Sequence, residues 1–151
     1  MSVNGQAEPT WGVAVEGKPS MMLQVALRAA ERNGGRPQAL PECNGASCDW
    51  VRQVAECLRS GRCRAAVLFC RDASLACCVA NKVPGVRAAA VETVAGAARA
   101  LDRLGANLLV VEMVGCTYWE CRELLRLCQR EAACPEGVAC VLRELDGHAH
   151  R

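Results

Sequence analysis

The stretch RAAVLFCRDASLACCVANKVPGVRAAAV, residues 64–91, decides how the rest of the chain is interpreted. An apolar run at residues 65–69 ends at Cys70, a segment of small residues follows, and a second apolar run occupies residues 86–91. This order predicts a strand, a short helix, a turn and a second strand. Ligands of open parallel sheets bind where the carboxyl end of a strand faces a helix N-terminus, so residues 70–74 are the candidate site.

Upstream of this stretch, apolar spacing and capping residues predict two further pairs of strand and helix. The expected elements are a strand at residues 11–15, a helix at residues 21–32 capped by Ser20, a short strand at residues 38–40, and a helix capped by Asp49 that ends before Ser60 and Gly61. Residues 41–47 are expected to form a loop, because Asn44 and Gly45 are typical turn residues.

The downstream part continues the alternation. The expected elements are a helix capped by Thr93 that ends at Gly105, a strand at residues 108–111, a helix from Tyr118 to about Glu131, and a further helix at residues 138–145. Thr117 and Glu120 have the spacing of a capping box at the start of the third of these elements.

Strands and helices therefore alternate along the chain, and each strand is a continuous apolar run. This pattern predicts one three-layer α/β/α domain with a five-stranded parallel, Rossmann-like sheet over residues 11–145. Residues 1–10 are expected to be a flexible lead, and residues 146–151 a polar tail.

The composition excludes several classes of function. A chain of 151 residues with 52% hydrophobic residues and a net charge of +2 is large enough to fold as one domain. Its basic residues are scattered, so no nucleic-acid surface or membrane-surface patch is predicted. No apolar run approaches the roughly 20 residues that span a bilayer, and residues 1–9 do not resemble a secretory signal. We expect a cytoplasmic protein.

The chain contains twelve cysteines but no C-x-x-C pair, and both histidines lie in the tail. Zinc-binding spacing is therefore absent, and no metal is predicted. In a reducing compartment the cysteines remain thiols, and those within helices, such as Cys57 and Cys128, are expected to be core or face residues. Cys43 and Cys48 are separated by four residues, and so are Cys116 and Cys121. This spacing is a weak signal for a metal site or a disulfide. The sequence does not support a redox-sensitive thiol.

VLFC followed by ten residues and then NKVPGVRAA is similar to the core of the type-B ribose-5-phosphate isomerase and galactose-6-phosphate isomerase family. The similarity continues through residues 106–109, Ala-Asn-Leu-Leu, to Gly115, and extends upstream to Asp49. In that family a cysteine, or in one branch a glutamate, is the base. A glycine-rich loop and C-terminal arginines hold the phosphate, and an aspartate-histidine pair and a second histidine assist.

The resemblance implies a role for individual residues of this chain. It implies Cys70 as the catalytic base, Glu92 at the position of the second histidine, and a substrate-binding set of Arg71, Asp72, Ala73, Ser74, Asn107 and Arg151. Cys70 also has a physical reason for a lowered thiol pKa, because it precedes a helix N-terminus. The other interpretation of Cys70 is a small buried apolar residue, and the other interpretation of Asn107 is a structural turn amide.

The sequence departs from the family pattern at several positions. The Gly-Thr-Gly-Ile-Gly loop of the family falls at residues 71–75, which contain no glycine, and Asp72 would repel an anion. Arg71 is either a direct phosphate partner or an exposed charge. The aspartate-histidine pair falls at Lys18 and Pro19, and the glutamate base at Ala76. Glu92, as a carboxylate at a helix N-terminus, is a poor acid.

Two functions remain. The first is a divergent ribose-5-phosphate isomerase B-like protein with lost or altered catalysis and a binding, regulatory or assembly role. We favour it because each missing group is typically worth roughly a hundredfold or more in rate. The alternative is an active sugar-phosphate isomerase that uses Cys70 as base with a rewired phosphate loop. The resemblance also implies a homodimer, a sugar-phosphate ligand and no cofactor, and it leaves a protein partner unidentified.

Overall fold

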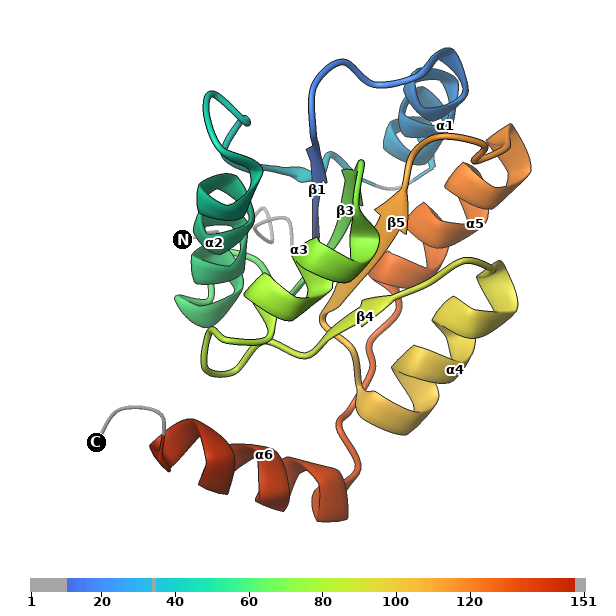
Figure 1. Cartoon of the computed structure of the whole chain (residues 1–151). Coiled ribbons are helices and arrows are strands. Elements are labelled where there is room, and N and C mark those ends of the chain that lie inside the picture. Colours follow the sequence, from blue (N-terminus) through green and yellow to red (C-terminus); the bar gives the residue numbers. More distant parts are fainter. Residues whose placement is uncertain (1–10, 34, 149–151) are drawn as a thin grey trace, which may run out of the picture.

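The computed structural model describes residues 11–33 and 35–148, and these ranges contain five strands and six helices (Figure 1). The elements are, in chain order, β1 (Trp11–Val15), α1 (Met21–Arg32), β2 (Gln38–Ala39), α2 (Ser47–Arg59), β3 (Ala65–Cys70), α3 (Ala73–Ala80), β4 (Ala88–Ala90), α4 (Val94–Leu104), β5 (Leu108–Glu112), α5 (Tyr118–Gln129) and α6 (Glu136–His148). The expected flexible lead and Arg151 lie outside the described residues.

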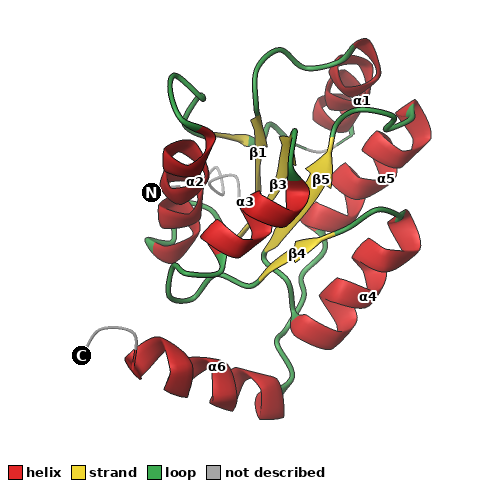
Figure 2. Cartoon of the chain, in the orientation of Figure 1, coloured by secondary structure: helices red, strands yellow, loops and turns green. Residues whose placement is uncertain are grey.

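The five strands form one parallel sheet in the order β2-β1-β3-β5-β4. Helices α2 and α3 pack on one face of the sheet, whereas α1, α4 and α5 pack on the other (Figure 2). This arrangement confirms the predicted three-layer α/β/α fold. Helix α6 lies to one side of the layers and has no buried residue.

Strand β3 is the centre of the hydrophobic core, and all six of its residues are buried. Successive side chains of a strand point to opposite faces. Accordingly Ala66, Leu68 and Cys70 contribute to the core beneath α2 and α3. Ala65, Val67 and Phe69 contribute to the core beneath α1, α4 and α5. A continuous apolar run is thus required by burial on both faces.

Most helix starts lie where the capping residues predict them. The Ser20 side chain accepts a hydrogen bond from the Leu23 N–H at 3.2 Å, and Thr93 accepts one from the Gly96 N–H at 2.9 Å. Thr117 and Glu120 form the predicted capping box. For α2 the predicted end before Ser60 is confirmed, but the predicted cap, Asp49, was wrong. This helix begins at Ser47, and Asp49 lies in its first turn, where a carboxylate still interacts favourably with the helix dipole.

Two other elements differ in length from the prediction. Strand β4 covers only three residues, because its pairing with β5 is limited to Ala88–Ala90 opposite Leu108–Val110. Helix α6 is longer than predicted and begins at Glu136. The Pro135 carbonyl accepts hydrogen bonds from the Val138 and Ala139 N–H groups, so this proline starts the helix rather than delaying it.

The NKVPG segment completes the edge of the sheet at β4. The Asn81 side chain donates to the Ala88 carbonyl at 2.9 Å and accepts from the Ala88 N–H at 2.8 Å. The side chain therefore replaces the strand that β4 lacks on its open edge. Asn107 accepts from the Arg87 N–H at 2.7 Å and donates to the Gly85 carbonyl at 3.0 Å. Both asparagines have structural roles at the amino ends of β4 and β5.

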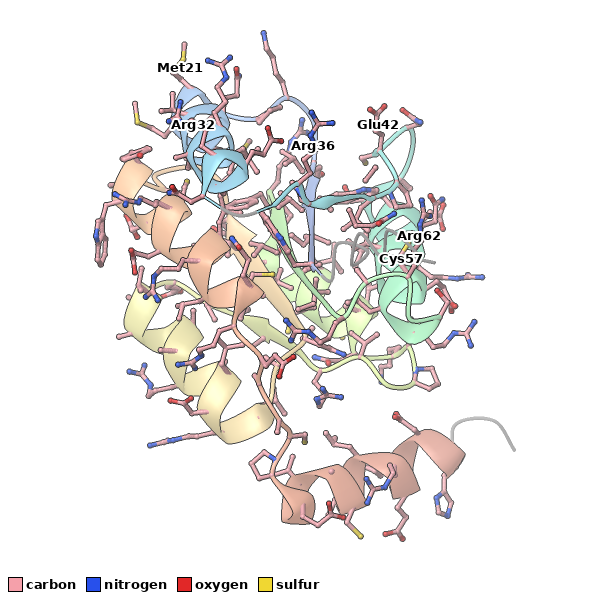
Figure 3. The ribbon with its side chains drawn as sticks, turned by 180° about the vertical axis from the view of Figure 1, so that it is seen from behind. Met21, Arg32, Arg36, Glu42, Cys57 and Arg62 are labelled. Atoms are coloured by element: carbon pink, nitrogen blue, oxygen red, sulfur yellow. The ribbon has the colours of Figure 1, made fainter. Side chains whose placement is uncertain are left out.

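All twelve cysteines are unpaired, and five of them are buried: Cys57, Cys63, Cys70, Cys121 and Cys128. Burial raises the pKa of Cys63 to about 11 and that of Cys128 to about 12. Cys57 lies beside Arg62 at the end of α2, with an Nη1 to Sγ distance of 3.8 Å (Figure 3). The predicted core role of the cysteines Cys57 and Cys128 is confirmed.

Among the described helices, none is both long and apolar enough to cross a membrane.

Candidate functional site

The carboxyl ends of four adjacent strands place charged groups along one edge of the sheet. Glu16 follows β1, Arg71 and Asp72 follow β3, Glu112 is the last residue of β5, and Glu92 lies two residues beyond β4. Ligands of open parallel sheets bind at this edge, and it is therefore the candidate site.

Glu16 joins three elements at this edge. Its Oε1 accepts a hydrogen bond from the Ser47 hydroxyl at 2.6 Å, at the beginning of α2. Its Oε2 accepts from the Arg71 N–H at 3.0 Å, at the turn after β3. A carboxylate of the chain therefore binds the first backbone N–H of the expected phosphate loop.

The beginning of α3 is also bound by carboxylates of the chain. Asp72 caps the helix, and its Oδ1 accepts from the Leu75 N–H at 3.1 Å. Glu112 Oε1 accepts from the Ala73 N–H at 3.3 Å. These are the donors that a helix N-terminus would otherwise offer to an anion. The chain thus supplies its own anions to the segment where the resemblance predicts a phosphate loop.

Cys70 lies beneath this network and is 3% exposed. Its Sγ donates to the Val111 carbonyl at a distance of 3.6 Å. Burial raises the pKa of the thiol to about 12, and the charges of Glu16, Glu112 and Asp72 add to the effect, against a hydrogen bond from the Asp72 backbone. The expected lowering of this pKa is wrong, because desolvation and three nearby carboxylates outweigh the helix N-terminus. Cys70 is a protonated thiol at neutral pH.

A cleft of about 680 Å³ opens beside α3. It lies between the beginnings of α3, α4 and α5 and the carboxyl ends of β4 and β5. Its charged lining residues are Glu92, Arg99, Glu112 and Glu120, and Ala73, Ser74 and Cys116 line it as well. Three carboxylates and one guanidinium make the cleft predominantly acidic. Within the described residues, no three His, Cys, Asp or Glu side chains are grouped in a way that can hold a metal ion.

A smaller hollow of about 230 Å³ lies on the other side of α3, between this helix and α2. Glu16, Ser47, Cys48, Arg71 and Asp72 line it. Helix α3 thus separates the predicted site residues into two groups. Ala73, Ser74 and Glu92 line the cleft, whereas Arg71 and Asp72 line the hollow. Cys70 lines neither.

Two predicted site residues are not part of this arrangement. Asn107 precedes β5 and lies at its amino end, opposite to Glu112, so the substrate-binding role predicted for it does not fit. Its alternative interpretation as a structural amide does fit. Arg151 lies outside the described residues.

The sequence prediction missed the two carboxylates that bind the loop, Glu16 and Glu112. Each is the first charged residue after an apolar strand, residues 11–15 and 108–111. The rule that selected residues 70–74, a polar group at the carboxyl end of a buried strand, applies equally to these two positions. The sequence of each strand taken alone does not show that both side chains point to the loop between β3 and α3.

A parallel sheet with its polar groups gathered at the carboxyl edge is the arrangement of open α/β proteins, the class to which this fold belongs. The family model described as Ribose/Galactose Isomerase matches residues 42–123, which is more than half of the chain. The chain therefore belongs to the Ribose/Galactose Isomerase family. No curated protein sequence is significantly similar to it.

Solved structures of the family share the fold at low sequence identity. The type B ribose 5-phosphate isomerase from Trypanosoma cruzi has a TM-score of 0.74 and 20% identity, over 95% of this chain and 99% of that chain. Ribose-5-phosphate isomerase B from Mycoplasma genitalium with bound ribulose-5-phosphate has a TM-score of 0.73 and 18% identity, over 93% of this chain and 96% of that chain. The ribose 5-phosphate isomerase from Thermotoga maritima has a TM-score of 0.70 and 15% identity, over 91% of this chain and 97% of that chain.

Proposed function

We propose that this chain is a divergent ribose-5-phosphate isomerase B-like protein with lost or altered isomerase catalysis and a binding, regulatory or assembly role. The observation that carries the proposal is the set of hydrogen bonds around α3. Glu16, Asp72 and Glu112 accept bonds from N–H groups of residues 71–75, the segment that corresponds to the phosphate loop of the family.

A sugar phosphate at this segment has to displace a carboxylate or bind beside it. Either route is unfavourable for an anion, since like charges at short range repel and a displaced carboxylate loses its hydrogen-bond donor. The side chains of Ala73 and Leu75 also occupy space that glycines leave free in the family. Arg71 is exposed on the opposite side of α3 from the cleft, so it does not neutralise the acidic cleft.

The proton-transfer groups are unfavourable as well. A general base works best with a pKa near the operating pH, and the pKa of Cys70 is raised to about 12. Lys18 and Pro19 stand where the family has its aspartate and histidine. Glu92 is exposed beside the beginning of α4. When several catalytic groups are lost, their separate effects on the rate multiply, provided that the groups do not act as one unit.

The alternative function is an active sugar-phosphate isomerase with Cys70 as base and a rewired phosphate loop. The cleft favours it, because 680 Å³ lies within the range of small-molecule sites and Arg99 provides a cation in its wall. In this version Glu92 is the second catalytic group, and the phosphate binds near Arg99 rather than at residues 71–75.

An isomerase assay on the purified, reduced protein separates the two functions. Ribose 5-phosphate is incubated with the wild type and with Cys70→Ala, and ribulose 5-phosphate is measured. The proposal predicts no conversion above the buffer control for either protein. Conversion by the wild type that is lost in Cys70→Ala establishes the alternative and overturns the proposal.

We also propose that the protein forms a homodimer through α6 and functions in the cytoplasm. Helix α6 exposes Val141 and Leu145, four residues apart on one side of the helix, with 54% and 60% of their surface accessible. A helix without any buried residue gains little from its own domain, and a second copy of the chain offers it an apolar partner. The cytoplasmic location is supported by the twelve unpaired thiols.

A further inference from the structure

Cys116 and Cys121 lie in contact at the wall of the cleft. Their Sγ atoms are 3.3 Å apart and share a hydrogen bond. Cys116 belongs to the loop after β5, and Cys121 lies in the second turn of α5. A disulfide requires about 2.05 Å between the sulfurs, so the two atoms need to approach by little more than about 1 Å.

The backbone on both sides of the pair is already fixed. The Cys116 N–H donates to the Met113 carbonyl at 3.2 Å, and the Cys121 N–H donates to the Thr117 carbonyl at 2.9 Å. Between them, Thr117 and Glu120 form the capping box. The contact is therefore a property of a rigid helix start, and the ordering of the chain that a disulfide normally demands is already in place.

The two thiols differ in access. Cys116 is half-buried and lines the cleft, whereas Cys121 is completely buried beneath it. An oxidant in the cleft therefore reaches the pair at Cys116. The two thiols share a proton: their hydrogen bond, together with burial, raises the pKa of Cys116, and the same hydrogen bond lowers the pKa of Cys121.

We propose that Cys116 and Cys121 form a reversible disulfide, which makes the wall of the cleft a redox-sensitive site whose oxidant is a hydroperoxide. A proton moved from Cys116 to Cys121 along their hydrogen bond leaves the accessible Cys116 sulfur as the thiolate. This thiolate attacks a peroxide oxygen, which breaks the O–O bond and gives a sulfenic acid and hydroxide. The second thiol displaces the sulfenic hydroxyl, which leaves as water, and the S–S bond forms. Two thiols lose two electrons and two protons, and the hydroperoxide R'OOH is reduced to R'OH and one water, which for hydrogen peroxide means two waters.

A disulfide between Cys116 and Cys121 would change the wall of the cleft. Val114 and Gly115, next to Cys116, and Glu120, next to Cys121, all line it. A bond between the two sulfurs adds a covalent link between this wall and α5, whereas in the dithiol form hydrogen bonds alone hold the same arrangement. This inference does not depend on the proposed function, because it concerns the two sulfurs and not a sugar-phosphate ligand.

Peptide mapping offers an internal control. Trypsin releases residues 104–122, which contain Cys116 and Cys121 as their only cysteines. It also releases residues 33–52, which contain only Cys43 and Cys48 at the same spacing, because cleavage before Pro37 is blocked. The Cys43 Sγ donates to the Gly45 carbonyl at 3.6 Å instead of contacting a second sulfur. The two peptides thus separate the effect of geometry from the effect of spacing.

The reduced full-length protein is treated with one equivalent of hydrogen peroxide, alkylated with iodoacetamide, digested and analysed by mass spectrometry. After oxidation we expect peptide 104–122 to have lost the mass of two hydrogens and to resist alkylation. After treatment with dithiothreitol it is expected to be alkylated at both cysteines. Peptide 33–52 is expected to be alkylated at both cysteines before and after oxidation. Recovery of peptide 104–122 with two alkylated cysteines after oxidation overturns the proposal. Equal closure of both peptides overturns it too, since spacing alone then accounts for the bond.

A stability measurement gives a second test. Oxidation is expected to raise the thermal midpoint of the wild type, and dithiothreitol to reverse the rise. Cys116→Ser, which keeps the half-buried position polar, is expected to show no shift, whereas Cys48→Ser is expected to keep it. A shift that persists in Cys116→Ser contradicts the assignment.

Discussion

At the scale of single residues, the environment of Cys70 decides its chemistry. The neighbouring carboxylates of Glu16 and Glu112 and the loss of water favour the protonated thiol. The position at the end of β3 is the one that the family uses for a base. The same position here holds a group that keeps its proton through the physiological range.

The raised pKa of Cys70 predicts a loss of stability in alkali. The unfolded chain releases this proton near the ordinary value of 9.0, whereas the folded protein keeps it until about 12. The folded state therefore binds more protons between these values, and its free energy of unfolding falls as the pH rises from about 9 to 12. Urea unfolding at several pH values is expected to show a shallower decline for Cys70→Ala than for the wild type.

Cys63 and Cys128 also have raised pKa values, so Cys70→Ala is expected to reduce the decline without abolishing it. An equal decline in wild type and variant contradicts the assignment of a buried, protonated Cys70. The overall loss of stability from the smaller side chain does not affect this comparison, because only the slope against pH is used.

At this scale the sequence predicts where residues 70–74 lie but not their chemistry. They follow the end of the buried strand β3, as the apolar run at residues 65–69 predicts. The direction of the Cys70 pKa shift depends on Glu16 and Glu112, which are 54 and 42 positions away in the printed sequence. Only the sheet order brings β1, β3 and β5 together.

At the scale of elements, the NKVPG segment and the beginning of α3 have separate roles at opposite ends of the sheet. Asn81 satisfies the open edge of β4, and Asn107 holds the turn before β5. Carboxylates occupy the N-terminus of α3. The two segments thus differ in what their side chains bind: the asparagines bind the backbone at the amino ends of β4 and β5, and the carboxylates bind the backbone at the beginning of α3.

Asn81→Ala is expected to destabilise the protein by about 1–3 kcal/mol, because it leaves the Ala88 N–H on the edge of β4 without an acceptor. The Ala88 carbonyl keeps only the weaker donor of the Cys77 thiol, at 3.4 Å. Chemical denaturation measures the change. The control is Lys82→Ala, an exposed neighbour that is expected to change the free energy of unfolding by less than about 0.5 kcal/mol. Equal effects of the two substitutions contradict the structural role of Asn81.

The elements themselves were largely predictable because their signals are local. The caps at Ser20 and Thr93 and the capping box at Thr117 are visible within four residues of sequence. The end of β4 was not predictable, since an edge strand is limited by its partner rather than by its own apolar run. The predicted start of α6, residue 138, was wrong because Pro135 was interpreted only as a break after α5. Its carbonyl in fact accepts the first hydrogen bonds of α6.

At the scale of the whole molecule, α6 is the element least explained by the domain itself. The linker before it packs closely on Gly105, where an added Cβ would collide with the backbone of Cys134. Near its other end, Asp146 accepts a hydrogen bond from the Gly85 N–H at 2.9 Å. The helix is therefore held at both ends while Val141 and Leu145 remain exposed.

This geometry predicts a dimer that depends on the exposed side of α6. Light scattering is expected to give twice the monomer mass for the wild type and the monomer mass for Leu145→Asp. Cys140→Asp introduces the same charge at an exposed position on another side of the helix and is expected to remain a dimer. A monomeric wild type, or equal dissociation by both variants, contradicts the proposed interface.

The most direct test of the central claim is calorimetric titration of ribose 5-phosphate into the wild type, Glu112→Ala and Glu92→Ala. Glu112 binds the Ala73 N–H, whereas Glu92 lines the same cleft and has no part in binding the loop, so it controls for charge alone. We expect no binding to the wild type or Glu92→Ala at millimolar ligand, and at least about tenfold tighter binding to Glu112→Ala, a gain of about 1.4 kcal/mol. Submillimolar binding to the wild type, or an equal gain in both variants, would contradict a phosphate loop occupied by the chain's own carboxylates.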